Sequence, residues 1–132
     1  MQDRPNVDEL LGAVQGFLQD DVLPGTSGRL SFHARVAGNA LQWIRRELEF
    51  EEEHLEREWT GLDQVLGESP PIPFGRRAAL AAVEERNGEL CRRINAGAFD
   101  TEPARARLLA HLRVATRDKL IVTNPGLLQG PG

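Results

Sequence analysis

The feature that most constrains this chain is the spacing of its apolar residues, which recur every three or four positions in five segments. That spacing places them on one side of an α-helix, and no stretch of six or more residues alternates as a half-buried strand does. Loops of about four to nine residues join the segments, so neighbouring helices should run antiparallel. The sequence therefore predicts an all-α, up-down bundle of four to five helices. The segments cover approximately residues 7–21, 29–50, 53–66, 76–96 and 101–123.

Several helix ends carry recognisable signals. Asn6 can cap the first helix, and Glu9 can reach back to it in a capping box. Three prolines within residues 67–75 indicate a stiff, extended loop. Gly97 is expected to end the fourth segment, and Thr101 to cap the fifth.

The middle of the chain allows two interpretations. Residues 47–58 are highly charged and contain no helix breaker before Gly61. Because typical helices have about 8–20 residues, we expect a bend or break near residues 50–52. The alternative is one continuous helix that extends past residue 60.

Size and cysteine content indicate the class of protein. With 132 residues the chain has the usual length of one domain, and we expect a single domain with an ordered core over residues 6–124 and a Gly/Pro tail over residues 125–132. The lone Cys91 cannot form an internal disulfide, and no signal-like N-terminus or membrane-spanning apolar run is present. We therefore expect a soluble, cytoplasmic protein with no membrane partner.

The charge is unevenly distributed along the chain. The net charge of −4 argues against a nucleic-acid partner. Residues 1–70 contain 6 basic and 14 acidic residues, whereas residues 71–132 contain 10 basic and 6 acidic residues. Either acidic and basic helices complement each other within the bundle, or the charges form a surface for a polar partner.

Sequence motifs of catalysis are missing. The chain has no Gly-x-Ser-x-Gly, no P-loop and no Gly-x-Gly-x-x-Gly. Glu51 and His54 form one Glu-x-x-His, but a di-iron bundle needs two, and both His33 and His111 are preceded at −3 by a leucine. We interpret residues 51–54 as a solvated acidic face and expect no metal and no cofactor. Cys91 is interpreted as a small core residue.

Polar residues on apolar helix faces are the main candidates for a site. By helical spacing, His33 lies within the apolar stripe of its segment, and Asp21 lies on that of the first segment. We predict that Asp21 pairs with Arg29 or His33, either as a satisfied core histidine or as part of a functional pocket. Glu47 and Lys119 lie at the edges of two stripes and are candidates for a partly buried ion pair.

Aromatic and arginine residues on the flanks are further candidates. Phe32 and Trp43 flank the second stripe, so they are either covered by another helix or exposed as an interface. Arg113 and Arg117 lie one turn apart on the outer side of the last helix, where they are either solvated or able to bind a phosphate or carboxylate. That helix is expected to bury Leu108, Leu109, Leu112, Ala115 and Leu120.

A family resemblance rests on the sequence between Leu30 and Leu41, which reads Leu-Ser-Phe-His-Ala-Arg-Val-Ala-Gly-Asn-Ala-Leu, and on the ending Lys119-Leu-Ile-Val-Thr-Asn-Pro125. The chain resembles a family of small bacterial proteins classed as a domain of unknown function. Members tend to be found beside aminoglycoside-phosphotransferase-like kinases and acyl-CoA dehydrogenases. The resemblance implies a helical accessory protein and brings no reaction and no catalytic residues.

Two classes of function follow from these observations. The first is a non-enzymatic interaction protein that binds a phosphotransferase-like or acyl-CoA dehydrogenase-like partner, or forms a homodimer. The second is a bundle that binds an acyl-CoA or a phosphate-bearing metabolite, or a cryptic enzyme, with a polar pocket near His33. A metal-dependent oxidase would need bound iron.

Overall fold

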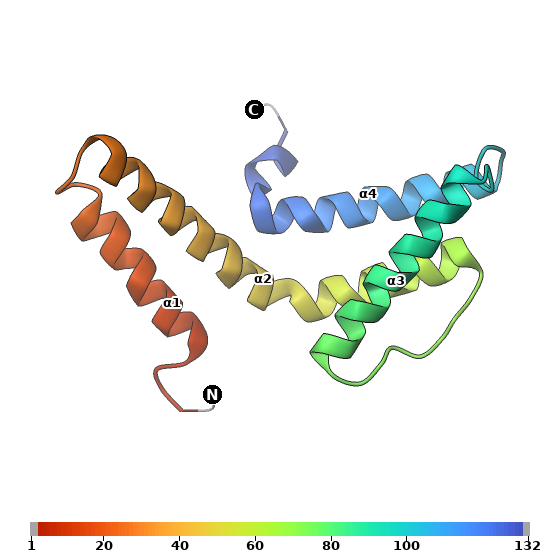
Figure 1. The fold of residues 1–132 in the computed structure, drawn as a ribbon, viewed down its shortest axis with the longest axis horizontal. Coiled ribbons are helices and arrows are strands. Elements are labelled where there is room, and N and C mark those ends of the chain that lie inside the picture. The colour runs from red at the N-terminus through yellow and green to blue at the C-terminus, as the bar shows by residue number, and fades with distance from the viewer. Residues whose placement is uncertain (1–2, 131–132) are drawn as a thin grey trace. The chain divides into compact units, whose positions relative to one another are not determined.

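The computed structural model of the protein describes residues 3–130, and this part of the chain is helical without strands (Figure 1). The predicted all-α fold is confirmed. The elements are α1 (Val7–Gly16), the π-helix η1 (Phe17–Val22), α2 (Gly28–Leu66), α3 (Arg76–Asn95), α4 (Ala104–Thr123) and the 3₁₀-helix η2 (Pro125–Leu128).

Helix α2 continues for 39 residues without interruption. The expected break near residues 50–52 is therefore wrong, and the alternative of a single helix is correct. No proline and no glycine occurs between Gly38 and Gly61, and an ion pair between Glu53 and Arg57 joins successive turns. In this segment the absence of a helix breaker therefore predicts the observed helix better than the usual length of helices does.

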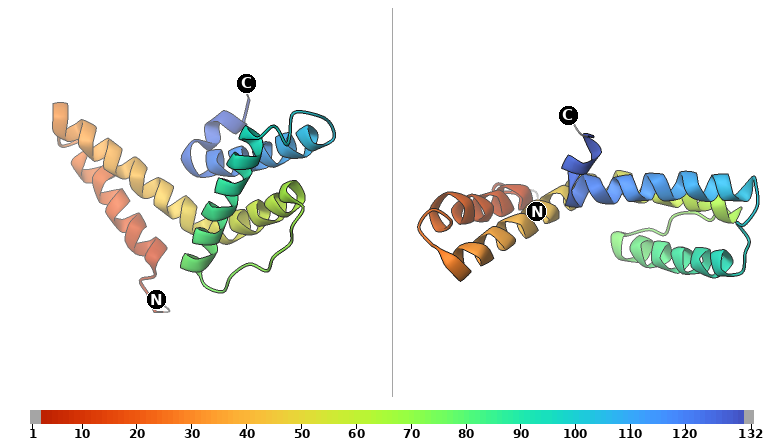
Figure 2. Two further views of the ribbon diagram at one scale, coloured as in Figure 1. Left: turned by 45° about the vertical axis from the view of Figure 1, so that its right-hand side comes forward. Right: turned by 90° about the horizontal axis from the view of Figure 1, so that it is seen from above.

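The chain separates into two compact units, Met1–Phe50 and Glu51–Gly132, and α2 contributes to both. In the first unit, α1 and η1 run antiparallel to the beginning of α2 (Figure 2). The predicted capping box is confirmed, because the Asn6 side chain accepts from the Glu9 backbone and the Glu9 side chain accepts from the Asn6 backbone. A short turn after Val22 then leads into α2.

The second unit contains the hydrophobic core. Trp59 and the fully buried Leu62 of α2 meet side chains of α3 and α4 there. The other buried members of this cluster are Val65, Leu66, Val83, Leu90, Phe99 and Leu108. Burial of this apolar surface is the main source of stability for the unit.

The sequence predicted some buried residues on the wrong helix faces. Cys91 is exposed, because α3 buries the face formed by Ala79, Val83 and Leu90 and Cys91 lies beside it. In α4, Leu109 and Leu112 are 45% and 41% exposed. Leu108 is buried as predicted, and the other buried residues of α4 are His111, Asp118 and Val122.

The proline loop over residues 67–75 has no regular helix, as predicted. The indole of Trp59 donates to the Pro70 carbonyl at 3.0 Å and so attaches the loop to the core. Gly97 adopts a positive φ of 82° just after α3, which confirms its place at the helix end. The Thr101 cap is not formed, because α4 begins at Ala104 with Pro103 at the capping position.

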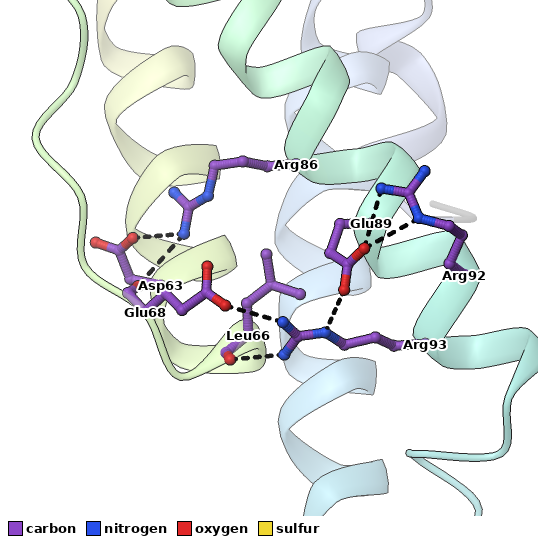
Figure 3. Close-up of polar contacts among 7 residues, drawn as sticks. All are labelled: Asp63, Leu66, Glu68, Arg86, Glu89, Arg92 and Arg93. Carbon is purple, nitrogen blue, oxygen red and sulfur yellow. Dashed lines mark hydrogen bonds and ion pairs between the residues drawn. The ribbon is translucent and has the colours of Figure 1, made fainter.

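Arginines of α3 hold α2 and the start of the loop (Figure 3). Arg86 binds Asp63 at 2.7 Å and lies 4.4 Å from the centre of the Trp59 ring. Arg93 binds Glu68 at 2.9 Å and donates to the Leu66 carbonyl at 2.9 Å, which is one of the last carbonyls of α2. These contacts agree with the interpretation that acidic and basic helices complement each other.

Candidate functional site

The two helices of the first unit meet along a polar seam. Gln15 is buried and donates to Gln42 at 2.7 Å. Arg45 donates to both carboxylate oxygens of Asp8, at 2.7 and 3.1 Å, and to Gln15 at 3.0 Å. The hydrogen bond from Arg45 holds the pKa of Asp8 below its ordinary value, and Asp8 in turn raises the pKa of Arg45. The hairpin is therefore joined by hydrogen bonds and not by a packed apolar layer.

The apolar side chains of this unit are consequently left outside. None of its large apolar residues is fully buried, and its only buried hydrophobic residue within the described part is Ala34. Ten large apolar side chains of α1, η1 and α2 are about half exposed. They are Val7, Leu10, Val14, Phe17, Leu30, Phe32, Val36, Trp43, Ile44 and Leu48.

Helical geometry divides the exposed apolar residues between two surfaces. We call the first the broad face; it consists of Val7, Leu10, Val14 and Phe17 with Leu30, Ile44 and Leu48. At about 100° per residue, and with the two helices antiparallel, the stripes of α1 and α2 fall on the same side of the hairpin. We call the second the outer patch; it consists of Phe32, Val36 and Trp43, on the side of α2 away from α1.

The candidate interface residues Phe32 and Trp43 are therefore exposed, at 59% and 48%. Of the two alternatives, cover by another helix is not observed. The Phe32 ring contacts the His33 ring edge-on, with 5.6 Å between their centres. The outer patch is thus an apolar surface in contact with solvent.

The predicted pairing of Asp21 with Arg29 or His33 is not formed. Asp21 is exposed, and its carboxylate has no hydrogen bond or ion pair within residues 3–130. Arg29 donates instead to His33 at 3.3 Å, and both are exposed, so His33 is not a core histidine. The reason is η1: a π-helix turns by less per residue than an α-helix, which rotates Asp21 away from the position expected from α-helical spacing.

Glu47 and Lys119 lie in different units. Glu47 is exposed in the first unit, and Lys119 is exposed on α4 in the second. An ion pair between them stays a prediction. Glu47 and His33 lie on the same continuous helix, 14 residues apart, or about 20 Å at the helical rise.

Arg113 and Arg117 border a shallow groove on α4. Both are exposed, and neither side chain has a hydrogen bond or ion pair to another described residue. The groove has a volume of about 320 Å³. Its apolar lining consists of Leu109, Leu112, Leu120 and Leu128.

Sequence reasoning missed a polar contact between α2 and α4. Asp118 is buried and accepts from Arg57 at 3.0 and 2.9 Å, and His54 lies 3.7 Å from its carboxylate. The side chains of His54 and Glu51 are only 15% and 17% exposed, and Glu51 binds Arg76, so the interpretation of these two as a solvated face is wrong. The burial of Asp118 could have been predicted from its spacing from Leu108 and Val122, which places all three residues on one helix face.

A second missed contact joins His111 to Gly61. His111 is buried, and burial lowers the pKa of its imidazole despite the nearby Glu58. A Cβ at Gly61 would overlap His111 Nδ1, so α4 can approach α2 here only because position 61 is glycine. Both residues border a cavity of about 460 Å³. The lone Gly61 within a helical pattern was the sequence feature that could have predicted this close approach.

The polar contacts of the second unit thus accompany helix packing, whereas the apolar surfaces of the first remain open. A family model described as "Domain of unknown function (DUF6285)" matches residues 24–127, most of the chain. The chain belongs to this family. No curated protein and no solved structure matches the chain.

The DUF6285 match includes α2, α3 and α4 and begins after η1, so the outer patch lies within the matched range while α1 precedes it. Within residues 3–130, no group of three or more His, Cys, Asp or Glu side chains is placed to hold a metal ion. None of the helices there combines the length and the apolar character that crossing a bilayer requires.

Proposed function

We propose that this DUF6285 protein is a non-enzymatic helical accessory protein that binds an enzyme of the phosphotransferase (kinase-like) or acyl-CoA dehydrogenase type. The observation that carries the proposal is the outer patch. Phe32, Val36 and Trp43 are 59%, 49% and 48% exposed on one side of a long helix. The partner classes come from the sequence resemblance.

The composition and position of the outer patch support this proposal. Aromatic residues are enriched in protein interfaces and dominate their binding energy. The three side chains follow the spacing i, i+4 and i+11, with which a helix fits into an apolar groove. Arg35 and Asn39 are exposed on neighbouring positions and supply a polar rim.

Trp43→Ala tests the proposal. Binding of the purified chain to phosphotransferase-like and acyl-CoA dehydrogenase-like enzymes is measured by calorimetry. We expect Trp43→Ala to weaken binding by about 2 kcal/mol, because an exposed tryptophan that becomes buried is a typical hot spot. Ile44→Ala is the matched control, since Ile44 is the next residue, is equally exposed at 47% and lies on the broad face. Failure of the chain to bind enzymes of either class would contradict the proposal.

A second candidate function is supported by the groove on α4. Leucines line the groove and two arginines border it, a combination that suits an apolar chain with an anionic group, as in an acyl-CoA. Acyl-CoAs should raise the melting temperature, because a ligand of the folded state stabilises it. This rise in melting temperature should be absent in the double variant Arg113→Ala/Arg117→Ala. The control double variant Arg29→Ala/Arg35→Ala should retain it. No shift in the unmodified chain would eliminate this candidate.

A further inference from the structure

We infer that the broad face is the contact surface for a second copy of this chain, so that two hairpins form a symmetric four-helix assembly. This inference uses a different surface from the proposed function and does not depend on it. Three properties of the first unit indicate this occupant: its missing apolar core, its exposed apolar area and the position of its charges.

The first unit has no apolar core of its own. Its seam consists of Gln15, Gln42, Asp8 and Arg45, and the apolar stripes of both helices are directed elsewhere. Two helices with exposed apolar stripes are marginal by themselves, because most of the stability of a helix comes from packing its apolar face. Two such hairpins packed face to face create the four-helix arrangement in which these stripes become a core.

The exposed area is sufficient for a stable dimer. Seven large apolar side chains of the broad face are each about half exposed, which corresponds to on the order of 700 Å² of apolar surface. Each partner contributes roughly 600–1,000 Å² to an interface of standard size. Leu11, Leu18 and Leu41 are half-buried and by helical spacing lie between the two stripes, so they extend the apolar surface.

The charges favour an identical partner. By helical spacing, the middle of the broad face carries no Asp, Glu, Lys or Arg, and His33, which accepts a hydrogen bond from Arg29, lies at its edge beside Ile44. In a two-fold assembly the same patch meets itself, so a charge in its middle would be placed against a like charge. An uncharged, self-complementary face satisfies that condition. Ala37 and Ala40 on α2 allow a close approach.

Sedimentation and light scattering of the full chain over a range of concentrations test the inference. We expect a dimer, and we expect Ile44→Glu to raise its dissociation constant about a hundredfold, because a buried unpaired carboxylate costs several kcal/mol. Val36→Glu is the matched control, since Val36 has nearly the same exposure, 49% against 47%, and lies about 80° further round the same helix, on the side away from α1. It should leave the dimer intact.

A second variant tests the contribution of α1. Val14→Glu should weaken the dimer as Ile44→Glu does, because Val14 is an exposed member of the broad face. Circular dichroism of each variant confirms that the helices are retained. A chain that is monomeric at all concentrations would overturn the inference, as would a dimer that Val36→Glu breaks and Ile44→Glu does not.

The test of the dimer and the test of enzyme binding can succeed or fail independently. Val36 belongs to the outer patch, so Val36→Glu should impair enzyme binding and preserve the dimer, whereas Ile44→Glu should do the reverse. A dimer without enzyme binding supports this inference and contradicts the proposed function, and enzyme binding by a monomer does the opposite.

Discussion

At the scale of single residues, Gly61 determines how closely α4 can approach α2. Its missing side chain leaves room for the imidazole of His111, which is buried against it and borders the nearby cavity. The same helix pair is joined by the contact of Asp118 with Arg57 and His54. Breaking one partner of such a buried contact leaves the other charge unpaired, which is more costly than the net contribution of the pair.

Gly61→Ala should lower the free energy of unfolding by about 1–3 kcal/mol, because the new methyl group overlaps the His111 ring and forces side chains or helices apart. Urea unfolding measures the change. Gly88→Ala is the control within the same unit: its Cβ would meet the Arg92 guanidinium at an ordinary 3.7 Å, so better helix propensity should stabilise the protein by up to about 1 kcal/mol. Equal effects of the two substitutions would contradict the close approach at Gly61.

At the scale of elements, the continuity of α2 links the polar hairpin of the first unit to the core of the second. The stretch around Glu52 contains only residues that are compatible with a helix, several of them charged, so its stability comes from backbone hydrogen bonds and i,i+4 pairs. Whereas α2 keeps α-helical geometry throughout, η1 departs from it as a π-helix. One π-helical segment is enough to change the direction of Asp21.

Glu52→Pro tests the continuity of α2. Proline in a helix interior removes a hydrogen bond and clashes with the preceding turn, which should cost about 3 kcal/mol or more and reduce the helical signal in circular dichroism. Glu52 is exposed, so Glu52→Ala should change stability by no more than about 0.5 kcal/mol. If the proline variant were as stable and as helical as the alanine variant, the helix would have to end near residue 52.

At the scale of the whole molecule, the two units differ in how they use apolar surface. The second unit buries Trp59, Leu62 and their neighbours in a common core, whereas the first joins its helices by polar contacts and exposes its apolar stripes. Exposed apolar surface of this extent is typical of interaction sites. The proposed enzyme partner and the proposed second copy use different sides of the first unit, so one protein can bind both.

The sequence by itself determined the features that depend on near neighbours. The helical class, the capping box at Asn6, the proline loop and the helix end at Gly97 all follow from spacing, capping and backbone preferences within a few residues. The local sequence also indicates a continuous α2, because it contains no helix breaker, although the usual length of helices argued against it.

Only the tertiary structure decided which helix faces are buried. In α4 the leucines at 109 and 112 are more apolar than His111 and Asp118, yet the polar pair is buried because it faces Arg57, His54 and Gly61 of α2. In the first unit His33 and Trp43 remain exposed because no helix of that unit covers their side of α2. Periodicity shows that a helix has an apolar side, but burial depends on what the other helix presents to it.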